Sequence, residues 1–128
     1  MKTVSSAGPI PRQKAGHLPG MLAGLRVVEV ADETAEYVGL ALGGLGAEVI
    51  KVEPPGGAAT RRIGPFLDDQ PGPDRSLYFW SYNRGKRSVT LDLSSPGDQA
   101  RFRRLLESAD ILLDASGGAV AKALAAAP

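Results

Sequence analysis

The sequence of 128 residues contains no cysteine and a single histidine. Disulfide bonds, thiol catalysis and cysteine-based metal sites are therefore excluded, and we expect no metal cofactor. No apolar stretch approaches the roughly 20 residues of a membrane-spanning helix, so we expect no membrane partner. The net charge is only +1, from 15 basic and 14 acidic side chains, which gives no electrostatic basis for nucleic-acid binding.

Apolar periodicity is also missing from residues 1–20, which are predicted to form a disordered tail rich in serine, glycine and proline. His17 lies in this tail without a positioned partner. Lys2 and Arg12 accompany no apolar core of a secretory signal, so the default location is the cytoplasm. Residues 21–128 are expected to form one domain, because 43% hydrophobic and 23% charged residues are typical of a globular protein.

The domain is organised around a strand, a helix and a second strand. A short β-branched run over residues 25–30 predicts a strand buried on both faces. Residues 35–45 change to helical spacing, and Gly46 stands where the end of a helix favours positive φ. Residues 48–52 predict the next strand. This order is typical of a right-handed βαβ unit.

The turn after the first strand, residues 31–34, lacks the G-x-G-x-x-G pattern of dinucleotide-binding folds. Asp32 and Glu33 would repel a phosphate at this position, so NAD and FAD binding here is not expected. We interpret Asp32 or Thr34 as the N-cap of the helix.

A long loop, residues 55–74, carries the basic pair Arg61 and Arg62. The pair could clamp a phosphate or carboxylate, but solvated surface charge is the favoured interpretation. Residues 75–83 predict one or two helical turns that contain most of the aromatic side chains, which are more often core residues than ligand platforms.

The rest of the chain alternates between strands and helices. Strands are predicted at 86–92 and 111–113, and helices at 96–108 and from residue 119 onward, with Ser95 as an N-cap. This order predicts an α/β fold with an open, mainly parallel, Rossmann-like sheet and helices on both faces. In such sheets ligands bind beyond the carboxyl ends of the strands.

Two segments, LGAEVIKVEPPGG from residue 45 and NRGKRSVTLDL from residue 83, resemble the N-terminal part of family III CoA-transferases in sequence and in their spacing. This is the CaiB/BaiF type, which includes formyl-CoA transferase and α-methylacyl-CoA racemase. The resemblance runs from about Leu22 to Asp114 and implies a Rossmann-like domain that is incomplete relative to the family's full fold.

The resemblance implies coenzyme A or acyl-CoA as substrate. Transferases of the family move CoA between an acyl-CoA and a carboxylate through an aspartyl intermediate, whereas racemases move the proton α to the thioester. Their chains interlock as homodimers, and a second CoA-transferase half is the alternative partner. Carried over by position, the residues expected to bind CoA are Pro54, Leu91, Asp92, Leu93, Ser94, Asp114, Ala115 and Ser116.

The chain departs from the family at several of these positions. Ser94 replaces a common lysine, Pro54 stands where relatives often have arginine, and residues 114–116 read Asp-Ala-Ser in place of Glu-Asn-Phe. Residues 34–37, Thr-Ala-Glu-Tyr, replace an Ala-Gly-Pro element, so we expect Glu36 to repel an anionic ligand.

The family's nucleophilic aspartate lies downstream of Pro128, so no catalytic residue is predicted in this chain. The chain is interpreted as the front of a longer enzyme, inactive alone, or as part of the degenerate half of a double-length member. A generic nucleotide-binding domain is a third interpretation, disfavoured by the missing glycine-rich loop. A parallel sheet of four strands leaves an open edge, so we expect the isolated chain to dimerise, aggregate or fold poorly.

Overall fold

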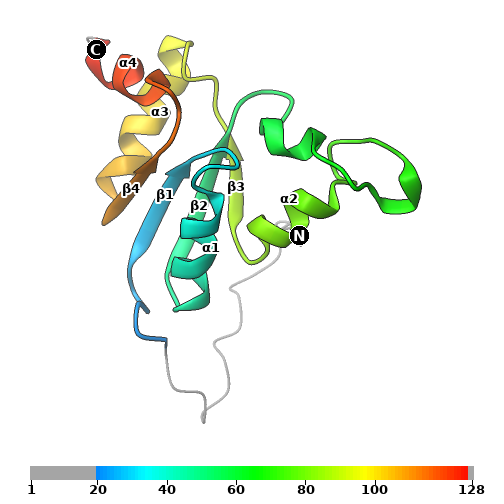
Figure 1. The fold of residues 1–128 in the computed structure, drawn as a ribbon. Helices are drawn as coiled ribbons and strands as arrows, with labels where there is room; N and C mark the ends of the chain where they lie inside the picture. The colour runs from blue at the N-terminus through cyan, green and yellow to red at the C-terminus, as the bar shows by residue number, and fades with distance from the viewer. Residues whose placement is uncertain (1–19, 127–128) are drawn as a thin grey trace, which may run out of the picture.

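The computed structural model describes residues 20–126 (Figure 1). The predicted tail and His17 therefore lie outside the described residues, apart from Gly20. In chain order the elements are β1 (Arg26–Val30), α1 (Glu36–Gly44), β2 (Glu48–Glu53), η1 (Ala59–Arg62), η2 (Leu67–Asp69), α2 (Leu77–Asn83), β3 (Arg87–Thr90), α3 (Pro96–Glu107), β4 (Ile111–Asp114) and α4 (Ala119–Ala125). None of the described helices has the length and apolar character needed to cross a membrane.

The four strands form one parallel sheet in the order β3-β2-β1-β4. Val28 in the centre of β1 lies opposite Ile50 of β2 and Leu112 of β4. The carboxyl ends of all four strands consequently meet at one edge of the sheet. The predicted open, parallel α/β fold is confirmed.

Both faces of the sheet are covered, as Figure 1 shows. On one face Val28 and its neighbours on β2 pack against Phe102 of α3 and Val120 of α4. On the opposite face Val27 and Val49 pack against Leu42 of α1. The adjacent valines of β1 thus enter two different cores, because successive side chains of a strand alternate between faces.

The ends of two helices differ from the predicted capping. Asp32 and Thr34 do not cap α1: its N-cap is Ala35, and the Asp32 carboxylate instead accepts hydrogen bonds from Thr34. Gly46 has the predicted positive φ, +106°. Ser95 occupies the N-cap of α3, as predicted, but its side chain makes no capping hydrogen bond.

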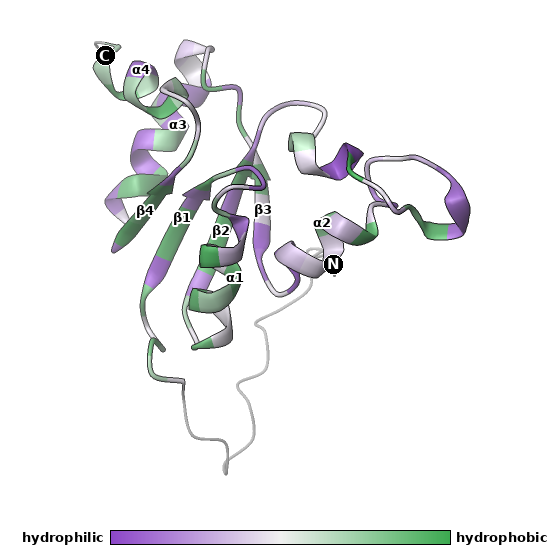
Figure 2. Cartoon of the chain, in the orientation of Figure 1, coloured by the Kyte–Doolittle hydropathy of each residue, from purple (hydrophilic) through white to green (hydrophobic). Residues whose placement is uncertain are grey.

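The inner face of α1 is not the one that apolar spacing suggests. Glu36 and Gly39 are its buried residues, whereas Tyr37 is 66% and Leu45 45% exposed. Figure 2 shows hydrophobic colour along much of this helix. In α2 only Phe79 is a core aromatic, and Trp80 is 41% exposed. An apolar surface therefore remains uncovered on this side of the sheet.

Candidate functional site

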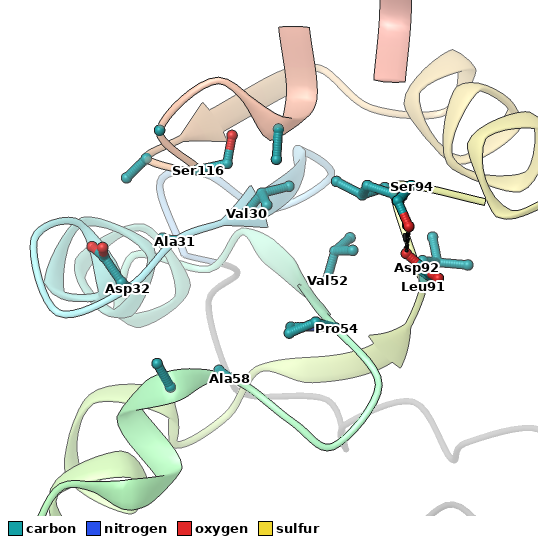
Figure 3. A pocket seen from close by; sticks show the side chains of 15 residues that line it. Val30, Ala31, Asp32, Val52, Pro54, Ala58, Leu91, Asp92, Ser94 and Ser116 are labelled. Atoms are coloured by element: carbon teal, nitrogen blue, oxygen red, sulfur yellow. Dashed lines mark hydrogen bonds between the residues drawn. The ribbon is translucent and has the colours of Figure 1, made fainter. Parts of the chain in front are cut away.

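A cavity of about 510 Å³ opens at the edge where the carboxyl ends of the strands meet (Figure 3). Segments that follow all four strands line it. Its lining residues are Val30, Ala31, Asp32, Val52, Pro54, Ala58, Ala59, Leu91, Asp92, Leu93, Ser94, Ala115, Ser116, Gly117 and Ala119. Its size lies within the usual range of small-molecule pockets, about 300–1,000 Å³.

The structure brings most of the sequence-predicted residues together around this cavity. Pro54, the stretch 91–94, Ala115 and Ser116 all line it. Asp114 is the exception: it is not a lining residue, and its Oδ1 accepts a hydrogen bond from the backbone N–H of Ser116 at 2.9 Å. Asp114 therefore contributes to the shape of the adjoining turn.

The floor of the cavity is apolar. Val30, Val52 and Leu91 lie at the ends of three strand segments and also belong to, or pack against, the core formed with α3. Figure 3 shows the side chains of Val30 and Val52 directed toward the space between the loops. Such a floor suits a flat, apolar ring system.

Two turns of the same design form opposite parts of the rim. Asp92 Oδ1 accepts hydrogen bonds from the backbone N–H of Ser94 at 2.9 Å and from its Oγ at 2.6 Å. Asp32 Oδ1 accepts the equivalent pair from Thr34 at 2.9 and 2.6 Å. The hydroxyl bonds, followed by the backbone bonds, hold the pKa of Asp92 and of Asp32 below its ordinary value. Both carboxylates are therefore charged at neutral pH.

A buried charge cluster of Glu29, Glu36, Lys51 and Lys86 supports the cavity from the α1 side of the sheet. Lys51 Nζ lies 3.1 Å from Glu29 Oε2 and 2.8 Å from Glu36 Oε1, and it donates to the carbonyl of Ala31 at 2.9 Å. Since Ala31 is part of the lining, Lys51 fixes one wall of the cavity.

The other lysine ties α1 to the rest of the cluster. Lys86 Nζ lies 2.8 Å from Glu29 Oε1 and donates to the carbonyl of Glu36 at 2.8 Å. Burial lowers the pKa of Lys86, and the bond to Glu29 opposes this shift. The expected repulsion of an anionic ligand by Glu36 is wrong, because this carboxylate is buried, paired with Lys51 and absent from the lining.

A second buried pair holds the loop after β2. Arg61 donates from Nε to Glu53 Oε2 at 2.6 Å and from Nη2 to Glu53 Oε1 at 2.8 Å. The same carboxylate accepts from the backbone N–H of Ala58, a lining residue, at 2.7 Å. The interpretation of Arg61 as solvated surface charge is therefore wrong, whereas Arg62 is exposed.

The pKa of Glu53 reflects this environment. Burial by itself would raise the pKa, but hydrogen bonds from Arg61, Ser88 and the Ala58 N–H outweigh it and lower the pKa from 4.5 to about 2. Glu53 is thus charged at neutral pH and anchors the loop.

Sequence reasoning missed both sets of buried charges. Their partners are far apart in the chain: Glu29 and Lys86, for example, are separated by 57 positions. A local signal did exist, since Glu29 and Lys51 each interrupt a β-branched run that predicts a buried strand. Among the described residues no group of three or more histidine, cysteine or carboxylate side chains is placed to hold a metal ion.

Comparison with known proteins places this geometry in a family. The sequence profile of CoA-transferase family III matches residues 22–127. The chain is 42% identical over 89 residues to succinyl-CoA:(R)-benzylsuccinate CoA-transferase subunit BbsE of Thauera aromatica, a match that covers 70% of the chain and 22% of that protein. It is 43% identical over 97 residues to succinate–glutarate CoA-transferase of Agrobacterium fabrum, covering 73% of the chain and 24% of that protein.

A solved structure of a CaiB/BaiF family protein from Brucella suis superposes with a TM-score of 0.72 and 38% identity. The superposition covers 86% of the chain and 30% of that protein. The chain therefore spans about a quarter of the length of the curated relatives it matches. Profile, relatives and fold agree, and the chain belongs to CoA-transferase family III.

Proposed function

We propose that this chain is the N-terminal part of a CoA-transferase and that its cavity binds the adenosine end of CoA or of an acyl-CoA. One observation carries the proposal: loops from all four strands form a single cavity at the sheet edge where ligands of such folds bind. The apolar floor suits adenine, and the rim offers hydrogen-bond acceptors to a ribose. Pro54, Ala115 and Ser116 complete the walls.

The reaction we propose for the whole enzyme transfers CoA to a carboxylate. An aspartate outside this chain attacks the thioester carbonyl, forms a mixed anhydride and releases CoA as a thiolate. The thiolate then attacks the aspartyl carbonyl of the anhydride, which releases the donor carboxylate and gives an aspartyl-CoA thioester. The acceptor carboxylate attacks this thioester and displaces the CoA thiolate, which finally attacks the acceptor carbonyl and frees the aspartate. In this scheme the described residues bind and orient CoA. We further propose that the whole enzyme is an interlocked homodimer in the cytoplasm.

Calorimetric titration of the 128-residue chain with CoA and acetyl-CoA tests the binding role. Ala59 is the site for a blocking variant, because it lines the cavity and is exposed, whereas Leu91 belongs to the core. We expect micromolar binding that weakens at least tenfold in Ala59→Trp, since the indole would fill the cavity mouth.

Ala100→Trp is the matched control, because Ala100 is exposed on α3 and does not line the cavity. It should bind CoA like the unmodified chain. Absence of binding by a chain whose circular dichroism and melting show it to be folded would overturn the proposal.

A non-catalytic half is the second candidate. A CoA-transferase relative from Mycobacterium tuberculosis, Rv1866, is 42% identical over 73 residues, and this match is only 9% of that protein. That relative is therefore roughly twice as long as the others, which supports a double-length arrangement with one scaffolding half. A folded chain that binds no CoA would favour this candidate. Exchange of the α-proton of an acyl-CoA in deuterated water would instead indicate a racemase.

A further inference from the structure

The cavity carries charge of one sign. Among the described residues that line it there are two carboxylates, Asp32 and Asp92, and no lysine, arginine or histidine. Figure 3 shows these two side chains at separate parts of the rim. The lining therefore favours a neutral hydroxyl over an additional phosphate monoester.

The cations of the surrounding segments face other partners. Lys51 is buried in contact with Glu29, Glu36 and the Ala31 carbonyl beneath the wall. Arg61 and Arg62 line a separate hollow together with Phe66. Among the described residues no cationic side chain lines the cavity; Lys51 beneath the wall attracts Asp32 weakly, whereas no cation acts in this way on Asp92.

The hydroxyl of Ser94 on the rim already donates a hydrogen bond within the protein. Ser94 donates its Oγ–H to Asp92 Oδ1 at 2.6 Å, so this hydroxyl is not available to donate to a phosphate. The second oxygen of Asp92, Oδ2, remains as an acceptor next to the apolar floor. An acceptor at this position favours a ribose hydroxyl, whereas a phosphate monoester carries close to two negative charges at neutral pH.

We propose that the cavity selects an adenosine whose ribose hydroxyls are free and discriminates against a 3′-phosphate, with Asp92 as the specificity-determining residue. The inference rests on the proposed function, since it concerns the same site. It implies that 3′-dephospho-CoA and its thioesters bind more tightly than CoA and its thioesters. The diphosphate and pantetheine are common to both ligands, so comparison of the two isolates the effect of the 3′-phosphate.

Calorimetric titration of the chain with CoA and with 3′-dephospho-CoA, at low and at high salt, tests the inference. We expect 3′-dephospho-CoA to bind roughly tenfold more tightly than CoA at low salt, because the 3′-phosphate of CoA is repelled by the partly exposed carboxylate of Asp92. The preference should shrink at high salt because the charges are then screened.

Two variants assign the effect to the rim. Asp92→Asn keeps a side-chain oxygen that accepts from Ser94 but removes the negative charge. The ratio of the affinities for 3′-dephospho-CoA and CoA should therefore fall toward one. Ser94→Lys should reverse the preference by tightening CoA. Asp69→Asn removes a charge from an exposed position with φ of +54° in the distant η2 loop, and it should leave the preference unchanged.

The outcomes separate the two proposals. If a folded chain binds neither ligand, the CoA site itself is overturned, and the specificity falls with it. If the chain binds CoA as tightly as 3′-dephospho-CoA, or more tightly, the specificity is overturned while the CoA site stands. If Asp92→Asn keeps the full preference, the assignment to Asp92 is wrong.

Discussion

At the scale of single residues, Glu53 at the end of β2 ties together β3 and the loop that follows β2. Its two oxygens receive donors from Arg61, from Ser88 of β3 and from the backbone of Ala58. Arg61 in turn stacks on the Phe79 ring, 3.9 Å from its centroid. One carboxylate thus fixes the loop that supplies Ala58 and Ala59 to the cavity.

We expect the stability of the chain to depend on pH through Glu53. Its pKa is about 2 in the folded chain and near 4.5 when unfolded, so its contribution is complete above about pH 4.5 and is lost as the pH falls toward 2. The contribution is on the order of 3 kcal/mol. Denaturant unfolding between pH 7 and pH 3 measures the loss.

A surface carboxylate provides the control. Glu48→Gln, which removes partly exposed ion pairs with Arg26 and Arg87, should keep most of the pH dependence, whereas Glu53→Gln should flatten it. If Glu53→Gln does not fold, the carboxyl titration of Glu53 in the unmodified chain can be followed by NMR. A titration midpoint near 4.5 would contradict the prediction.

At the scale of elements, helix α1 is held against the sheet through charge and close approach. Gly39 lies directly over the buried charge cluster: a Cβ atom there would collide with Glu29 Oε1 and approach Lys86 Nζ to 3.2 Å. A Cβ atom added to Gly44, in the same helix, would meet no atom of another element within 4 Å. The two glycines therefore serve different purposes.

Gly39→Ala should destabilise the chain by about 2–4 kcal/mol, because overpacking is added to disruption of a buried ion pair. Gly44→Ala should instead stabilise it by about 0.5–1 kcal/mol, because alanine is the better helix former and nothing obstructs its methyl group. Urea unfolding of both variants checks the pair. Equal effects of the two substitutions would show that Gly39 is not a close-contact position.

The strands and α-helices could be predicted from the sequence, but the two 3-10 helices within residues 55–74 and the inner face of α1 could not. Strand runs, Gly46 and Pro96 are local signals, and the structure has strands and helices at these places. The burial of Glu36 depends on Lys51 and on Thr60, whose hydroxyl donates to Glu36 Oε1 at 2.6 Å, 24 positions away. A pattern read along one helix cannot contain such a partner.

The candidate site could likewise be predicted in part from the sequence. Its position at the strand ends follows from the alternating element order, which is a property of the whole sequence. The buried pairing of Arg61 with Glu53 could not be predicted, because the sequence around Arg61 is that of an exposed loop. Only folding brings Glu53 to it. Long-range ion pairs are therefore the part of this site that sequence patterns leave out.

At the scale of the whole molecule, apolar surface and open strand edges remain uncovered. Strands β3 and β4 each have one unpaired edge in the described sheet. On α1 and at its C-terminal end, Tyr37, Val38 and Leu45 are all more than two-fifths exposed. Surface of this kind is typical of a face that packs against another protein segment.

We expect the isolated chain to self-associate at micromolar concentration, and sedimentation velocity over a concentration series measures this. The double variant Tyr37→Lys with Leu45→Lys should weaken association roughly tenfold or more, since it places two charges on the apolar face. Ala100→Lys on the exposed surface of α3 is the control and should change little. A single monomeric species throughout the micromolar range would disprove the prediction.

The strand order also has a consequence for the sequence of assembly on the ribosome. β1 is the first strand of the described sheet to be synthesised. Its two neighbours are β2, which follows at once, and β4, whose Ile111 pairs with Val27 from far downstream in the chain. Chains grow from the N-terminus at about 5–20 residues per second. The βαβ unit can therefore close early, while the other edge of β1 waits several seconds for residues 111–114. Of the two inner strands of the sheet, β1 is therefore synthesised first and is the last to gain its second neighbour.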